Sequence, residues 1–244
     1  MSYLIGIDIG TTGTKTILVD ERGNQLASAL EEYPLYTPHP KWAEQEPEDW
    51  WKATVNTVRE VMEKSEINKA DIKGIGLSGQ MHGLVIMDKK HQVLRPSILW
   101  CDVRTSGQCE YIRETVGTEI LTQSTCNPVL EGFTAPKIIW VRDNEPEIYE
   151  QTANILLPKD YVRFRLTGEI SMEVSDAAGT LLFDIKQREW SQVVLDKLDI
   201  RPGLLPSTYE SIDVCGQITP NVAETTGLLA GTPVVGGGAD NACS

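Results

Sequence analysis

The chain has 244 residues, 41% of them hydrophobic and 23% charged, which is enough apolar sequence to fold around a buried core. Asp and Glu outnumber Lys and Arg by 35 to 22, and the net charge of −13 argues against a general nucleic-acid binder and against docking onto anionic lipid. No apolar run reaches the roughly eighteen residues of a membrane-spanning helix, and the N-terminal MSYLIGIDIG lacks the basic segment of a signal peptide. The five cysteines form no CxxC pair and suit reduced thiols, so we expect a cytoplasmic protein.

The first thirty residues predict an antiparallel β-meander. Strand-forming residues occupy 3–7, 14–19 and 25–30, and the two turns between them, at 10–13 and 20–24, are too short for crossover helices. A helix is then expected over 44–65, because Trp51, Val55, Val58 and Met62 recur at helical spacing and should face the core.

Further strands and helices follow in mixed order. A short apolar strand at 74–77 enters a Gly-flanked loop, 84–87 and 92–94 resemble a hairpin, and 98–100 is another apolar run. Residues 105–170 read as mostly helical with a break at 127–128, and a strand at 180–184 precedes a short helix near Trp190. A last strand at 233–235 runs into a glycine loop, and the mixture of strands with long helices indicates an α/β fold.

The first candidate site is the turn that follows the first strand. An apolar strand delivers Asp8 to Gly10, Thr11 and Thr12, with Lys15 three residues further on. Glycines let backbone N–H groups approach a phosphate, threonine hydroxyls add donors, and a single carboxylate can hold Mg²⁺ through water. On local chemistry alone a plain tight hairpin explains the pattern equally well, and the spacing is not that of a P-loop.

The second candidate lies near the other end of the chain. An apolar strand delivers Asp240 beside three consecutive glycines, and Asn241 follows it. Such an aspartate could act as a general base on a substrate hydroxyl. A flexible glycine loop is the simpler explanation in isolation, but two strand–Gly–Asp units in one chain favour a functional interpretation.

The third candidate is the loop over 78–83. It presents Gln80, Met81 and His82 between glycines, with Trp100 and Asp102 following the next apolar run. Polar side chains at strand ends beside one aromatic face suit a polyol pocket. A lone histidine is more often structural than catalytic, although His82 lies on a loop and not on an apolar face.

Several longer stretches resemble the FGGY carbohydrate kinases, within the actin/hexokinase/Hsp70-like ATPase superfamily. Residues 132–144 match the first signature pattern of that family throughout, and residues 8–12 match its first phosphate loop. The stretches 42–45, 157–161 and 175–184 are also similar, and the resemblance runs from Tyr3 to the last residue. It implies a ribonuclease-H-like α/β domain with a mixed sheet flanked by helices.

The resemblance also implies roles for the candidate residues. Asp240 would be the base that takes the proton of the terminal sugar hydroxyl, and Met81 and His82 would line the sugar. Asp8 would organise Mg²⁺ and the transferring phosphate of ATP. Phosphate contacts would come from Gly10, Thr11, Thr12 and Lys15, and further pocket candidates are Gln80, Trp100, Asp102 and Asn241. These roles match the general needs of phosphoryl transfer, which are positioning and charge neutralisation.

The stretch 80–83 bears on the sugar. Glycerol kinases carry an Arg-Glu pair where Met81 and His82 stand, and the flanking Gly79, Gln80 and Gly83 are more similar to family members that act on xylulose. The implied reaction converts ATP and D-xylulose into ADP and D-xylulose 5-phosphate. Gluconate kinases share the Met-His pair, so a gluconate or other polyol kinase stays open, as does a sugar-binding module without turnover.

Family members are roughly twice as long as this sequence, with an adenine-binding half after the second Gly–Asp loop. The resemblance therefore implies that 1–244 is the N-terminal sugar-binding domain, without the C-terminal ATP-binding domain, and we expect little or no turnover from it alone. The expected small-molecule partners are a sugar and ATP. The sequence does not fix the oligomeric state, and a homodimer stays open.

Overall fold

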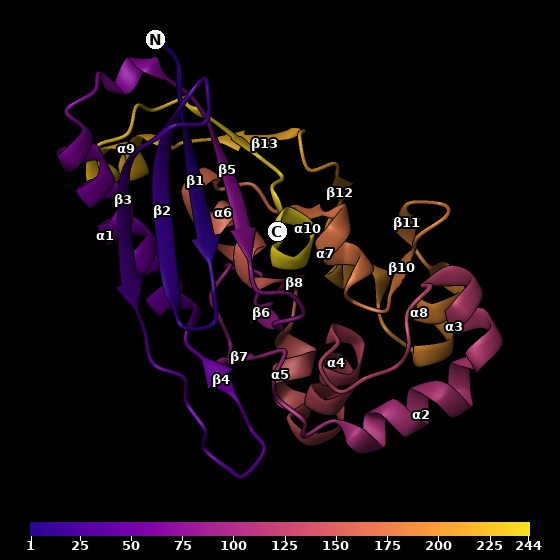
Figure 1. Ribbon diagram of the computed structural model, residues 1–244. Coiled ribbons are helices and arrows are strands. Elements are labelled where there is room, and N and C mark those ends of the chain that lie inside the picture. The colour runs from indigo at the N-terminus through magenta and orange to yellow at the C-terminus, as the bar shows by residue number, and fades with distance from the viewer.

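The computed structural model describes all residues from Met1 to Ser244 and contains the predicted meander. Its three antiparallel strands are β1 (Tyr3–Ile9), β2 (Gly13–Asp20) and β3 (Gln25–Glu32). They lie side by side in Figure 1 and continue into a seven-stranded sheet. On the far side of β1 the sheet adds parallel β5 (Ile72–Gly79), and β5 pairs in parallel with both β14 (Pro233–Val235) and β15 (Gly238–Ala239). Antiparallel β13 (Val214–Gln217) closes the edge, so the sheet is mixed as expected.

Helix α1 (Pro47–Ser65) begins three residues later than predicted. Pro47 occupies the first helical turn, and Glu44–Gln45 instead form strand β4, which pairs with β7 (Ser97–Ile98). Pro suits this position because its missing N–H has no helical partner there. The helix ends at Glu66, whose φ of 51° is left-handed.

The core face of α1 also differs from the prediction. Trp50, Val58 and Val61 are completely buried, whereas Trp51 and Met62 only pack against the edge of the core. Val55 and Val58 are therefore buried as expected, but the stripe is rotated away from Trp51 and Met62. The helix contacts β2, β3 and helix α6 (Pro158–Thr167) together, and this tertiary packing sets which side faces inward.

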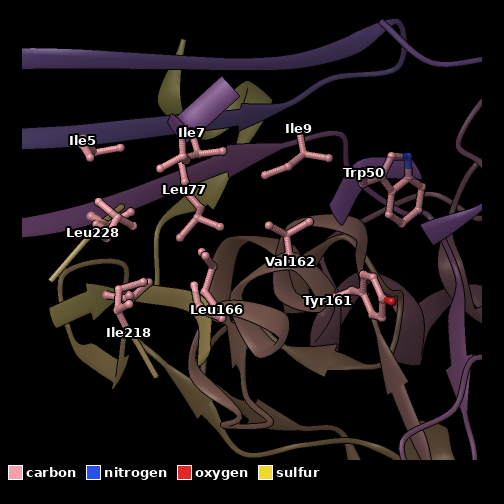
Figure 2. Packing of buried hydrophobic residues seen from close by; sticks show 14 of the residues in the cluster. Ile5, Ile7, Ile9, Trp50, Leu77, Tyr161, Val162, Leu166, Ile218 and Leu228 are labelled. Carbon is pink, nitrogen blue, oxygen red and sulfur yellow. The ribbon is translucent and has the colours of Figure 1, made fainter. Parts of the chain in front are cut away.

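One face of the sheet is covered by helices. Ile7 and Ile9 of β1 point from that face toward Leu166 and Val162 of α6, as Figure 2 shows. Ile5 of the same strand lies over Leu228 and Ile218. Side chains alternate along a strand, so the intervening Leu4, Gly6 and Asp8 lie on the opposite face. That alternation places Asp8 away from the main core.

A second hydrophobic cluster of 23 buried residues holds the middle of the chain, which is mostly helical as predicted. Its helices are α2 (Ser106–Val116), α3 (Thr118–Ser124), α4 (Thr134–Asn144), α5 (Pro146–Gln151) and α8 (Gln192–Leu198). In Figure 1 they lie together, beside the sheet.

The structure refines two local predictions in this part. β6 (Val85–Met87) pairs with the distant β8 (Asn154–Leu156), and the predicted hairpin is reduced to a single bridge between Met87 and Val93. The expected short helix near Trp190 is present as α8, which begins at Gln192, while Trp190 itself lies in a short strand, Glu189–Trp190, that pairs with Phe183–Asp184. Both refinements come from pairing partners that a local sequence pattern does not reveal.

The remaining elements are short. They are η1 (Lys69–Asp71), β9 (Met172–Glu173), α7 (Val174–Ala178), β10 (Phe183–Asp184), β11 (Glu189–Trp190), η2 (Pro202–Leu204), β12 (Thr208–Tyr209), α9 (Pro220–Thr226) and α10 (Asp240–Cys243). None of the helices has both the length and the apolar character needed to span a bilayer.

Candidate active site

Three parallel strands end at one point of the sheet. Gly79 at the end of β5 pairs with Ile9 of β1 on one side and with Ala239 of β15 on the other. Neighbouring strands lie about 4.8 Å apart, so the residues that follow these three ends come close together. Ligands of open α/β sheets bind at such carboxyl ends. The register thus brings the Asp8 loop, the loop starting at Gln80 and the Asp240 loop to one edge.

The loop after β1 is held by the side chains of Tyr33, which is half-buried, and Gln45, which is buried. Tyr33 donates from its hydroxyl to the carbonyl of Gly10 at 2.6 Å, and Gln45 Nε2 donates to the carbonyl of Thr11 at 2.7 Å. The Gly10 N–H closes the turn on the carbonyl of Gly13 at 3.0 Å. The loop is therefore anchored on one side, while the side chain of Thr12 stays exposed.

The face of the sheet that carries Asp8 holds a groove of about 620 Å³. Lys15 is directly opposite Asp8 in the strand register, both are exposed, and both line the groove together with Ser78 and the glycine loop. Because Gly6 and Gly76 have no side chains, they leave its floor open. The structure thus brings Asp8 and Lys15 together in the groove, whereas Gly10, Thr11 and Thr12 lie in the adjoining turn and do not line it.

The donor set around Asp8 fits one mode of magnesium binding. No cluster of three His, Cys, Asp or Glu side chains could hold a metal ion by itself. Asp8 is nevertheless exposed at the groove, and Mg²⁺ commonly uses one carboxylate with waters and phosphate oxygens as its other ligands. These residues therefore fit a Mg²⁺ ion that arrives with a nucleotide phosphate.

Gln80 links the first loop to the second. Its side chain is 1% exposed, donates through Nε2 to Gln45 Oε1 at 3.0 Å and accepts from Thr11 Oγ1 at 3.2 Å. Trp100, 48% exposed, donates from its indole N–H to the same Thr11 hydroxyl at 2.9 Å. Gln80 thus connects the two loops from inside, whereas Trp100 presents its ring to solvent beside them.

His82 is fixed in a defined tautomer. Its Nδ1 lies 2.7 Å from the carbonyl of Gly179, which can only accept, so Nδ1 carries the proton and Nε2 is an acceptor. The ring packs on Phe133 with centroids 4.6 Å apart. Burial lowers the pKa of His82 to about 4, so the imidazole is neutral near pH 7.

The backbone of His82 is held in a left-handed conformation with φ 66°. Its carbonyl accepts hydrogen bonds from Lys137 Nζ at 2.9 Å and from Thr134 Oγ1 at 3.2 Å, both on α4. Burial lowers the pKa of Lys137 to about 7. Helix α4 therefore positions the loop that carries Met81 and His82.

Asp240 starts α10 directly after β15. Its Oδ1 accepts from the Asn241 N–H at 2.8 Å, and the Asn241 side chain donates to the sulfur of Met81 at 3.6 Å. Both residues are at least partly exposed. Asn241 thus lies between Asp240, which it follows in the chain, and Met81, which it contacts.

Asp102 does not belong to this group. Its side chain is completely buried, and Oδ2 accepts from the Ala43 N–H and from Arg104 Nη2, both at 2.7 Å. The remaining oxygen accepts from the Arg104 N–H at 2.9 Å. We therefore correct the prediction that Asp102 is a pocket residue: it is a buried structural partner of Arg104. Its position after an apolar run in the sequence did not reveal that it would be buried.

Sequence reasoning missed several residues that support the site. They are Tyr33, Gln45, Phe133, Lys137 and Gly179. Four of them lie inside the stretches 42–45, 132–144 and 175–184 that carry the family resemblance. The match to the family's sequence patterns was therefore the signal that could have found these four residues. Nothing in that match indicated which loop each side chain would hold.

The mixed sheet with its flanking helices is the actin- and hexokinase-like fold of sugar kinases. Sequence comparison agrees. The sequence model described as the N-terminal domain of the FGGY family of carbohydrate kinases matches residues 3–244, and the chain belongs to that family.

Individual relatives and solved structures are similar along the whole chain. A xylulose kinase of Bacillus subtilis (strain 168) is 49% identical over 243 residues, covering 100% of this chain and 48% of the relative. The crystal structure titled as a xyloylose kinase from Brucella ovis superimposes with a TM-score of 0.94 at 38% identity, covering 99% of this chain and 49% of that one. A gluconate kinase from Lactobacillus acidophilus superimposes with a TM-score of 0.91 at 28% identity, covering 98% and 48%. The chain thus spans about half the length of the curated relatives it matches.

Proposed function

We propose that this chain is the sugar-binding part of an ATP-dependent kinase that phosphorylates D-xylulose to D-xylulose 5-phosphate. The observation that carries the proposal is the register in which Gly79 pairs with both Ile9 and Ala239, since it joins Asp8, the Met81–His82 loop and Asp240 at one edge. The relative with 49% identity is named a xylulose kinase, which supports the choice of sugar.

Asp240 is proposed as the general base. One of its oxygens accepts from the Asn241 N–H, and no protein hydrogen bond engages Oδ2. As the sugar hydroxyl oxygen forms a bond to the γ-phosphorus, its proton passes to Asp240 and the bond between that phosphorus and the β,γ-bridging oxygen breaks, so that ADP leaves. Positioning matters most in such a loose transition state, and the nearby Asn241 and Met81 limit where the hydroxyl can lie.

The nucleotide phosphates are proposed to meet the first loop. The Thr11 hydroxyl and the Gly10 N–H already donate to Gln80 and Gly13, so the proposed donors are the Thr12 hydroxyl and the backbone N–H groups of Thr11 and Thr12. Lys15 supplies a positive charge in the groove. Asp8 is the residue that would hold Mg²⁺, which neutralises phosphate charge when it is bound. The acidic surface of the chain does not oppose this, because a few local donors determine the binding of one anion.

The side chains proposed to contact the sugar favour an uncharged molecule. Met81, Trp100 and Asn241 carry no charge, and His82 is neutral at pH 7 because burial lowers its pKa. Gluconate carries a carboxylate, which is expected to need a cation in its pocket. Gluconate is the second candidate because a gluconate kinase shares the fold at a TM-score of 0.91.

A sugar panel tests the proposal. The full-length protein that contains this chain is assayed for ADP release with xylulose, gluconate and glycerol at several concentrations. We expect the highest kcat/KM with xylulose. Faster turnover of gluconate would favour the second candidate, and sugar binding without ADP release would indicate a non-catalytic binding module.

A further inference from the structure

A completely buried charged cluster lies behind the loop that carries Asp240. Lys159, Asp160 and Arg163 project from α6, and Asp176 from α7. All four side chains are 0% exposed. Asp160 Oδ1 bridges the two cations, at 2.7 Å from Lys159 Nζ and 2.8 Å from Arg163 Nη1, and Asp176 Oδ2 lies 3.2 Å from Lys159 Nζ.

The Lys159 and Arg163 side chains both donate hydrogen bonds to a single backbone atom of the glycine loop. The carbonyl of Gly236 accepts from Arg163 Nη1 at 2.8 Å and from Lys159 Nζ at 3.1 Å. Burial alone would lower the pKa of Lys159, but the Asp160 and Asp176 carboxylates outweigh it and hold that pKa above its usual value. Two charged donors on one carbonyl fix the direction of that peptide group strongly.

The rest of the loop is held just as tightly. The Ala239 N–H donates to Ser175 Oγ at 2.9 Å, and the Ser175 hydroxyl donates to Glu173 at 2.5 Å. Gly237 has φ 76°, and a Cβ there would lie 2.1 Å from the carbonyl oxygen of Leu77. From Gly236 to Ala239 the backbone therefore has little freedom, and Asp240 is the next residue.

Stability does not explain such a cluster well. Desolvating buried ion pairs costs several kcal/mol per ion, and well-packed apolar side chains are often as stable. Here Arg163 Nε and Asp160 Oδ2 have no hydrogen-bond partner, which adds to the cost. This cluster is costly to bury, and it donates two hydrogen bonds to one carbonyl of the loop. These two properties suit a role in orienting that loop.

We propose that Lys159 and Arg163 are positioning residues for Asp240, because they fix the Gly236 carbonyl and so set where the Asp240 carboxylate meets the sugar hydroxyl. This inference rests on the proposed function of Asp240 as the base. A displacement of about 1 Å in a reacting group can reduce turnover on the order of 100-fold. Lys159→Met and Arg163→Met are therefore expected to lower kcat by about 10- to 100-fold with little change in sugar affinity.

The test is a double-mutant cycle in the full-length kinase. We measure kcat, KM for xylulose and unfolding temperature for Lys159→Met, Arg163→Met, Asp240→Asn and the double variant of Arg163→Met with Asp240→Asn. Arg163→Lys is the variant that retains a charged donor. Once the Asp240 carboxylate is gone, Arg163→Met is expected to cost no further turnover, and Arg163→Lys is expected to retain much of kcat. A full additional loss in the double variant would contradict the inference.

Arg95→Met is the matched control. Arg95 is similarly buried and ion-paired with Glu44, but it bonds no atom of residues 236–240. The Arg95→Met variant should have a lower unfolding temperature without a selective loss of kcat. Equal kcat losses for Arg95→Met and Arg163→Met would overturn the positioning role. If Asp240→Asn alone keeps its turnover, the proposed function itself fails. If Asp240→Asn is inactive but both methionine variants in the cluster keep kcat, only the present inference fails.

Discussion

The imidazole of His82 is neutral because the protein surrounds it, and this state has a consequence for stability. The pKa of His82 in the folded chain is about 4, against 6.5 in an unfolded one, with burial as the main cause. Between these pH values the unfolded chain binds a proton that the folded chain does not. This contribution to stability is therefore complete above pH 6.5 and is lost as the pH falls toward 4.

His82→Gln should remove that dependence on pH. From the shift in pKa, the difference in unfolding free energy between wild type and variant should change by on the order of 3 kcal/mol between pH 7 and pH 4. Urea unfolding at several pH values measures it, with His39→Gln, an exposed histidine, as the control. If the unfolding free energies of wild type and variant differ by the same amount at pH 7 and at pH 4, the buried, neutral state of His82 is contradicted.

Gly179 allows His82 and Met81 to approach closely. A Cβ at Gly179 would lie 2.8 Å from the His82 ring and 3.0 Å from the Met81 methyl group, while the backbone conformation itself permits any residue. Gly179→Ala is therefore expected to displace the Met81–His82 loop and to raise KM for the sugar, at a cost of about 1–3 kcal/mol in stability from overpacking.

Steady-state kinetics on the full-length protein measure the effect of Gly179→Ala. Gly107→Ala is the control, since a Cβ there meets nothing within 4 Å and alanine stabilises an exposed helix position by up to about 1 kcal/mol. An unchanged KM for the sugar in Gly179→Ala would contradict the role of this glycine in positioning the Met81–His82 loop.

For single elements, the local sequence pattern predicted where the strands lie better than it predicted which strands pair with each other. Short loops and alternating residues predicted β1, β2 and β3 with their antiparallel order. The pairing of β6 with β8 joins residues about seventy positions apart, and no local pattern contains that information. The same holds for β15, whose two residues read as part of a flexible glycine loop but pair with β5.

The rotation of α1 shows a similar limit. Helical spacing alone allows several neighbouring stripes, and the prediction chose the stripe of Trp51 where the structure buries that of Trp50. Trp50 also donates its indole N–H to Gln45 Oε1 at 3.0 Å, which connects the helix to the loop after β1. Such a contact depends on three elements meeting and is not visible in the pattern of one.

Paired alanine substitutions test the observed face of α1. Trp50 is 0% exposed, so Trp50→Ala should cost about 3–5 kcal/mol in unfolding free energy. Trp51 packs at the edge of the core beneath the Arg165 guanidinium, 4.7 Å from its ring, and Trp51→Ala should cost clearly less. Chemical denaturation gives both values, and the opposite order would contradict the structure.

In the molecule as a whole, the site lies where two hydrophobic clusters meet. The loop after β1 is held from the sheet side by Tyr33 and Gln45, whereas His82 is held by Lys137 and Thr134 of α4, which belongs to the helical part. The sequence predicted both loops but not their support, because the supporting side chains come from elsewhere in the fold. Gln80 is the direct link between the two halves of the site.

The residues proposed to contact the sugar, namely Met81, His82, Asp240 and Asn241, all lie in this chain, so residues 1–244 alone are expected to bind it. Xylulose should raise the unfolding temperature of this chain in a concentration-dependent way, since a ligand that binds only the folded state stabilises it. Sorbose, a ketose of different length, serves as the comparison sugar. No shift at saturating xylulose would contradict the assembly of the sugar site within this chain.

The central claim is that Asp240 takes the proton of the sugar hydroxyl during phosphoryl transfer. The most direct measurement is kcat for xylulose-dependent ADP release by the full-length protein with Asp240→Asn, together with the Kd for xylulose from calorimetry. The account predicts a loss of about 100- to 10,000-fold in kcat, as general bases typically contribute, with Kd changed only a few-fold. Turnover of the variant within a few-fold of wild type would contradict it.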